Sequence, residues 1–93
     1  MSKLTTDQVR FNLGKAPGWK LTDDQTALSR TFLFVDFASA THFVSRVAEW
    51  VEGTGVLPDV RIHGSTVTIT LTSQHVRGLT GKEFALAQII NKI

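Results

Sequence analysis

Histidines are the side chains of this sequence best suited to proton transfer, because an imidazole titrates near neutrality. The three histidines are spread singly along the chain, at His42, His63 and His75. A lone histidine in a small domain is usually a surface residue, and we expect this of His42 and His63. The chain contains no cysteine, which excludes a disulfide or a thiolate metal site, and we predict neither a metal nor a cofactor.

The stretch "GVLPDVRIH" at residues 55–63 has the glycine, proline and aspartate of a functional loop. Where a catalytic loop would carry proton-transfer groups, this one has Val56 and Leu57. Neither side chain can donate, accept or titrate. Two interpretations follow. The pair either lines an apolar cleft or meets a partner, or it simply fills apolar space.

The composition is that of an ordinary globular domain. With 93 residues, 42% hydrophobic and 19% charged, the sequence predicts a single domain over residues 1–93 with a modest core. It has no long apolar run for a membrane span, and the stretch "MSKLTTDQ" lacks the apolar core of a signal peptide, so we expect a cytoplasmic protein. Ten scattered Lys and Arg against eight Asp and Glu do not favour nucleic acid as a partner.

Capping residues and hydrophobic periodicity predict three helices. The first begins after Thr5, with Gln8 as its capping-box partner, and the last begins after Thr80, with Glu83 in the same role. A central helix over about residues 37–52 carries an apolar stripe with Trp50 at its edge. We expect Trp50 to pack against the edge of the core, with an anchor for a partner as the second interpretation. The stripe consists of Phe43, Val44, Val47, Ala48, Trp50 and Val51.

Strands are predicted on both sides of a turn at residues 22–25, and again at 59–63 and 65–73, around the two-residue turn Gly64-Ser65. In the last strand, apolar residues alternate with threonines, which indicates one covered face. The run Phe32–Val35 is apolar at every position, which predicts burial on both faces or an oligomer contact.

These elements predict an α+β fold in the order α-β-β-α-β-β-α, with a four-stranded antiparallel sheet covered on one face by three helices. The edge of such a sheet has to be paired or protected, and the core of so short a chain is small. We therefore expect a homo-oligomer, either a dimer formed through strands or a tetramer.

Four stretches resemble the pterin-4a-carbinolamine dehydratase family and follow the order of that family's fold. They are "GW" at 18–19, "FLFVDF" at 32–37, "FVSRVAEWVE" at 43–52 and "TITLTSQHVRGLTGKEFALA" at 68–87. The family removes water from a 4a-hydroxytetrahydropterin. Its signature is an acidic residue, three spacers and His-His-Pro, followed later by a third histidine just before Gly-Leu-Thr.

The resemblance implies that Glu52 holds the acidic position and that Val56, Leu57 and Gln74 hold the histidine positions. His75 lies one residue late, and if the strand persists that far its side chain points to the opposite face. We therefore predict no catalytic residue, and a vestigial cleft or partner-binding surface instead. The surface would consist of Glu52, Val56, Leu57, Pro58, Asp59, Gln74 and His75.

Two functions remain open. The segment 55–59 is similar to the Gly-x-x-Pro-Asp loop of a family branch that also lacks the histidines and is considered a Rubisco assembly factor of α-carboxysomes. This resemblance implies a non-catalytic chaperone that binds Rubisco subunits and is associated with carboxysomes. The alternative is an active or residual dehydratase that uses Glu52, Asp59 or His75 for proton transfer.

Overall fold

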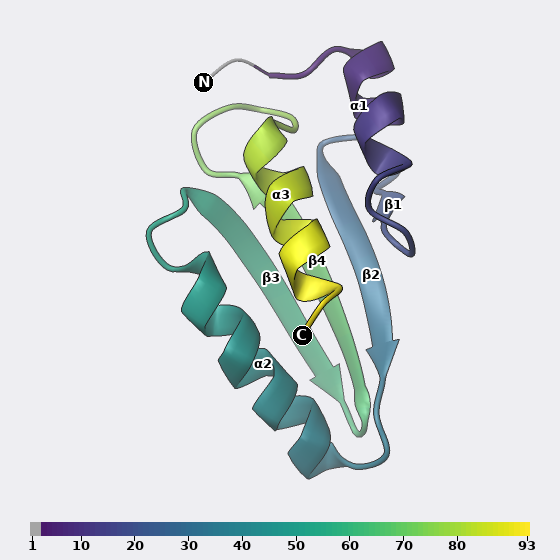
Figure 1. The fold of residues 1–93 in the computed structure, drawn as a ribbon, viewed down its shortest axis with the longest axis vertical. Coiled ribbons are helices and arrows are strands. Elements are labelled where there is room, and N and C mark those ends of the chain that lie inside the picture. Colours follow the sequence, from purple (N-terminus) through teal and green to yellow (C-terminus); the bar gives the residue numbers. More distant parts are fainter. Residues whose placement is uncertain (1–2) are drawn as a thin grey trace.

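The computed structural model describes residues 3–93, and its elements follow the predicted order (Figure 1). The elements are α1 (Thr6–Leu13), β1 (Lys20–Leu21), β2 (Ala27–Leu33), α2 (Phe37–Val51), β3 (Val56–His63), β4 (Thr66–Ser73) and α3 (Gly81–Ile90). The predicted domain also included Met1 and Ser2, which lie outside the described residues. Across residues 3–93, no helix combines the length and the apolar character needed to cross a bilayer.

The four strands form one antiparallel sheet in the order β1-β2-β4-β3, so β4 is central and β3 is an edge. The helices lie on one face of this sheet (Figure 1), and the predicted fold class is confirmed. In β4, Val67, Ile69 and Leu71 are fully buried in the core. The threonines between them face the uncovered side, because side chains alternate along a strand.

Side-chain caps begin each helix. Thr5 accepts a hydrogen bond from the Gln8 amide (3.2 Å), and its own amide donates to Gln8 Oε1 (2.9 Å). Thr80 and Glu83 form a second capping box, in which the Thr80 amide donates to Glu83 Oε1 over 2.6 Å. Asp36 caps α2 by accepting from the amide three residues on (2.8 Å). Both predicted capping boxes are confirmed, and each satisfies amides that a helix start leaves free.

A hydrogen-bonded cluster ties the start of the sheet to the end of α3. Trp19 Nε1 donates to Asn91 Oδ1 (2.9 Å), and Asn91 Nδ2 donates to the Pro17 carbonyl (3.0 Å). Arg30 Nη1 donates to the same carbonyl (3.1 Å). Gly18 lies at the centre with φ +88°, and a β-carbon there would stand 2.7 Å from Arg30 Cζ. The positive φ therefore favours glycine at this position, and a β-carbon would also displace the Arg30 guanidinium from its hydrogen bonds.

The apolar stripe of α2 is narrower than predicted. Phe43 and Val47 are buried, but Ala48 is exposed and Trp50 keeps 52% of its surface exposed. At about 100° per residue, Ala48 and Trp50 lie at the two margins of the stripe, beyond the part that meets the sheet. The prediction that both belong to the packed face is wrong, and Trp50 is a surface residue.

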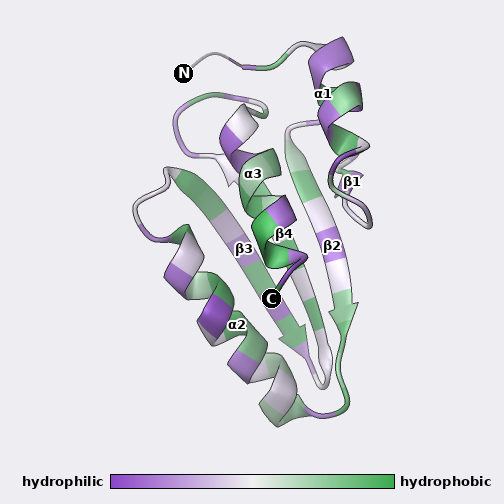
Figure 2. Cartoon of the chain, viewed as in Figure 1, coloured by the Kyte–Doolittle hydropathy of each residue, from purple (hydrophilic) through white to green (hydrophobic). Residues whose placement is uncertain are grey.

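The apolar run after β2 is buried on one face only. Phe32 and Phe34 pack against the core, whereas Leu33 and Val35 are 80% and 89% exposed. The connection from β2 to α2 accordingly stands out as hydrophobic in Figure 2. Burial of both faces is a wrong prediction for this chain, because the helices cover one side of the sheet. An oligomer contact stays a prediction.

β3 begins at Val56, earlier than the predicted start at Asp59. The segment expected to be a loop is therefore the first part of an edge strand. The Gln74 amide donates to the Gly55 carbonyl over 3.1 Å. Because every second residue of an antiparallel strand bonds to its neighbour, Gly55 bonds on the side of β4 and the Pro58 nitrogen points to the outer edge. An edge strand tolerates proline there because no ladder bond needs that missing N–H.

Candidate functional site

The pairing of β3 with β4 brings together the three positions at which the resemblance implies histidines. Val56 pairs with Ser73, and Leu57 pairs with the residue before it. Gln74 follows directly and donates its amide hydrogen to Gly55 (3.1 Å). Val56, Leu57 and Gln74 therefore gather at one end of the sheet, where β3 starts and β4 ends.

Val56 and Leu57 nevertheless face opposite sides of the sheet, as neighbours in a strand must. The Val56 side chain is 5% exposed and belongs to the hydrophobic core. The Leu57 side chain is 51% exposed on the uncovered face. Val56 thus fills the core, and Leu57 is available at the surface, so the two do not share one wall of a cleft.

The acidic and proline positions lie at the surface. Glu52 is the exposed C-cap residue of α2. Pro58 and Asp59 are exposed in β3, where Asp59 Oδ1 lies 3.5 Å from Arg61 Nε. An ion pair between exposed side chains contributes little to stability. The role predicted for these three residues, a partner-binding surface, stays a prediction.

Gln74 and His75 are exposed in the loop that leaves β4. β4 ends at Ser73, so His75 does not continue the strand, and strand alternation does not determine which face its side chain takes. The His75 amide donates to Ser73 Oγ (3.2 Å). The His75 ring lies 3.7 Å from the point where a β-carbon would stand at Gly55, and Lys82 Nζ lies 3.6 Å from the same point.

Sequence patterns did not identify Lys82 as part of this region. It lies in the first turn of α3, and its approach to Gly55 depends on how α3 packs against the β3–β4 end of the sheet. No local pattern reports such a tertiary contact. The other two histidines, His42 and His63, are exposed as predicted.

A cleft of about 650 Å³ opens beside the loop that carries Gln74 and His75. Asp24 contributes a carboxylate to it, and hydrogen bonds from the Thr22 hydroxyl and then from Thr26 lower the pKa of that carboxyl. Asp24 is therefore a hydrogen-bond acceptor at neutral pH rather than a proton donor. The cleft is lined by Asp24, Thr26, Thr72, Ser73, Gln74, His75, Val76, Arg77 and Gly78.

The chemistry of this arrangement follows from its side chains. Val56 and Leu57 offer no proton-transfer group, and Gln74 offers an amide that hydrogen-bonds without titrating. His75 supplies the imidazole of the cleft, from an exposed loop. Within residues 3–93, no three His, Asp or Glu side chains gather in a group that could hold a metal ion.

A sequence profile described as "Pterin 4 alpha carbinolamine dehydratase" matches residues 2–93. The chain belongs to the pterin-4a-carbinolamine dehydratase family. A relative from Cyanothece sp., named provisionally as a pterin-4-alpha-carbinolamine dehydratase, is 36% identical over 94 residues, which cover 100% of this chain and 95% of the relative. A relative of the same name from Chloroflexus aggregans is 37% identical over 93 residues, covering 100% and 98%.

A solved structure supports the same membership of the pterin dehydratase family. It is described as a transcriptional coactivator/pterin dehydratase from Brucella melitensis, and it superposes on this chain with a TM-score of 0.91. The sequences are 26% identical, and the match covers 98% of this chain and 97% of the other. The sheet and helices that position residues 56, 57 and 74 are therefore those of the family.

Proposed function

We propose that this member of the pterin dehydratase family is non-catalytic and acts as an assembly factor that binds other protein chains. The observation that carries the proposal is Val56, whose side chain lies in the core, 5% exposed, at a position where the resemblance implies a histidine. Removal of water from a 4a-hydroxytetrahydropterin needs a positioned proton donor and acceptor. Loss of one such group lowers the rate by about 10²–10⁴-fold, and here three positions lack one.

Exposed apolar side chains support a role in protein binding. Trp50 and Leu57 each leave about half of their surface exposed, at 52% and 51%. Leu33 at the end of β2, Val35 in the connection and Phe37 at the start of α2 are also exposed. Exposed apolar groups that cluster indicate contact surfaces, and a half-exposed tryptophan is a common anchor in protein interfaces.

The strand edges support a homo-oligomer. β1 pairs with β2 only at Leu28 and Ser29, so within residues 3–93 the outer edge of β2 has no strand beside it at Thr31 and Leu33. A second copy aligned along this edge would supply hydrogen-bond partners and would cover Leu33. We propose a dimer through strands, with a tetramer as the larger assembly. Light scattering over a concentration series tests this, and a monomer at every concentration would contradict it.

Rubisco subunits are the proposed clients, on the strength of the resemblance between residues 55–59 and the Gly-x-x-Pro-Asp segment of the assembly-factor branch. Four of these positions, from Val56 to Asp59, form the start of β3. That strand carries Leu57 on its uncovered face. A chaperone of this kind would work in the cytoplasm, in association with carboxysomes.

Assembly of Rubisco from its large and small subunits tests this proposal. The yield of holoenzyme is measured with and without the wild-type protein, with Leu57→Asp, and with His63→Asp as the matched control. His63 is exposed on the same face of the same strand, so the control adds the same charge at the other end of β3. We expect the wild type and the control to raise the yield and Leu57→Asp to raise it less. An unchanged yield with the wild type would contradict an assembly role.

Residual dehydratase activity is the second candidate, favoured by the position of His75. Its ring lies beside Gly55, next to the residues at the family's histidine positions. Purified protein and its His75→Ala variant are incubated with a 4a-hydroxytetrahydropterin, and loss of the substrate is followed by absorbance. Turnover well above the spontaneous rate that disappears in His75→Ala would establish this activity. Equal, near-spontaneous rates are the outcome that the non-catalytic proposal expects.

A further inference from the structure

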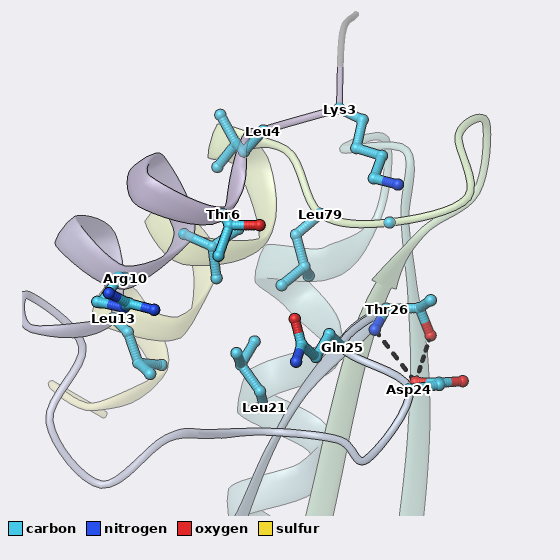
Figure 3. A pocket seen from close by; sticks show the side chains of 12 residues that line it. Lys3, Leu4, Thr6, Arg10, Leu13, Leu21, Asp24, Gln25, Thr26 and Leu79 are labelled. Atoms are coloured by element: carbon cyan, nitrogen blue, oxygen red, sulfur yellow. Dashed lines mark hydrogen bonds between the residues drawn. The ribbon is translucent and has the colours of Figure 1, made fainter.

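A second cavity, of about 350 Å³, lies between α1 and the turn that joins β1 to β2 (Figure 3). It adjoins the cleft described above at Asp24, Thr26 and Gly78 but opens under α1 rather than beside the histidine loop. Its volume is at the lower end of the range for small-molecule sites. Its apolar lining consists of Leu4, Val9, Leu13, Leu21 and Leu79.

Leucine side chains give this cavity an apolar lining. Leu79 is 1% exposed and continuous with the core, and Leu4, Leu13 and Leu21 are partly buried against that core. Figure 3 shows Leu21 and Leu79 bordering the same space from two segments that are far apart in the sequence. An apolar group that enters here would cover the parts of Leu4, Leu13 and Leu21 that remain exposed, with Leu79 behind them.

The polar lining is predominantly cationic. Lys3 and Arg10 are both exposed at the cavity, and Asp24 is the carboxylate that lines it with them. Asp24 Oδ1 already accepts hydrogen bonds from the Thr22 hydroxyl (2.7 Å), the Thr26 hydroxyl (2.8 Å) and the Thr26 amide (3.1 Å). These bonds hold Asp24 in place but leave its charge, so two cations against one carboxylate give the lining a net positive charge.

Gln25 adds a polar side chain to the cavity from the turn that joins β1 to β2. Its φ is +60°, a left-handed conformation that side chains other than glycine rarely adopt. Figure 3 shows its amide extending into the space that Leu21 and Leu79 border. The positive φ belongs to the turn that joins β1 to β2, in which the Gln25 backbone amide donates to the Thr22 carbonyl over 2.8 Å.

We propose that this cavity binds a small organic anion with an apolar body, of the class of medium-chain carboxylates. The apolar body packs on the leucines. The carboxylate lies at the rim and accepts a hydrogen bond from the Gln25 amide, which extends into the cavity. Arg10 and Lys3 border the cavity from opposite sides and make its electrostatic field positive (Figure 3). The site uses none of the residues proposed for protein binding, so the test of this proposal is independent of the test of the assembly role.

Octanoate is the probe for this site, with 1-octanol as a neutral molecule of the same chain length. Both are titrated into isotope-labelled full-length protein, and amide chemical shifts are followed by NMR. We expect saturable shifts in α1, in the turn at residues 22–26 and around Leu79. Octanol should bind severalfold more weakly than octanoate, because it lacks the charge.

Three variants separate the proposal from non-specific binding. Arg10→Gln should weaken octanoate binding by about two- to fivefold, the effect of losing one exposed ion pair. Gln25→Gly removes the amide but keeps the backbone conformation, and it should also weaken binding. Lys15→Gln is the control, because the Lys15 ammonium lies over the Phe11 ring (4.5 Å) and does not line the cavity.

Four results would overturn the proposal. They are the absence of saturable shifts, equal affinity for octanol and octanoate, equal weakening by Arg10→Gln and Lys15→Gln, and shifts confined to the loop of Gln74 and His75. Arg10, Lys15 and Gln25 are exposed, so these variants keep the core intact.

Discussion

Substitution of Val56 and Leu57 by the same residue, threonine, tests which of them belongs to the core. Val56→Thr replaces a buried methyl, which costs about 0.8 kcal/mol, and places a hydroxyl in the core, which costs about 1–3 kcal/mol if it finds no partner. The neighbouring Thr54 hydroxyl is already engaged, since it donates to the Val51 carbonyl (2.7 Å) and accepts from the Val56 amide (3.1 Å). We expect a loss of about 2–4 kcal/mol in the free energy of unfolding.

Leu57→Thr should change the free energy of unfolding by no more than about 0.5 kcal/mol, as is usual for surface positions. Leu57 lies on the uncovered face opposite Thr72, where a second threonine fits a β-strand. Urea unfolding gives both values, and in thermal melts Val56→Thr should lower Tm by on the order of 10–20 °C. Each melt is repeated at two protein concentrations, which separates unfolding from dissociation. Equal losses in both variants would refute the assignment of Val56 to the core and Leu57 to the surface.

Three further predictions follow from single contacts. Thr80→Ala should lower the free energy of unfolding in urea by about 2 kcal/mol, because it removes an N-cap and one hydrogen-bond donor to the buried Glu83 carboxylate. Thr80→Ser keeps the hydroxyl and should lose much less. The pKa of Asp24 is lowered from 3.8, so its contribution to stability is present above that pH and is lost as the pH falls through the folded-state pKa. Asp24→Asn should therefore flatten the acid limb of the stability profile, and an unchanged limb would count against these hydrogen bonds. Gly18→Ala should lower Tm more than Gly53→Ala, since both glycines have positive φ but a β-carbon meets another side chain only at Gly18. Equal shifts in Tm for the two variants would show that the positive φ accounts for the loss at Gly18 and that the contact with Arg30 does not add to it.

Local signals in the sequence were sufficient for most of the fold. The two capping boxes fixed the starts of α1 and α3, because their hydrogen bonds join residues three apart and need no tertiary context. The alternation of apolar residues with threonines in β4 fixed its buried face. The turn Gly64-Ser65 fixed the register of β3 against β4, since a two-residue hairpin leaves His63 opposite Thr66.

The features that sequence patterns did not predict depend on tertiary packing. A glycine, a proline and an aspartate in residues 55–59 suggested a loop, yet an edge strand accepts the proline and β3 simply starts earlier. The width of the buried stripe on α2 depends on how much of the helix the sheet covers, so the exposure of Trp50 could not be predicted from periodicity. At the candidate site, the start of β3 at Val56 places the Val56 and Leu57 side chains on opposite faces of the sheet. The packing of α3 brings Lys82 to Gly55.

The central place of β4 affects how the protein emerges from the ribosome. β2 and β3 both pair with β4, whose residues 66–73 are translated after both of them. A growing polypeptide leaves the exit tunnel from its N-terminus, so β2 waits without its inner neighbour until β4 has appeared. The bond from Trp19 to Asn91 forms later still. Folding of this sheet therefore waits for β4 and joins segments that are far apart in the order of synthesis.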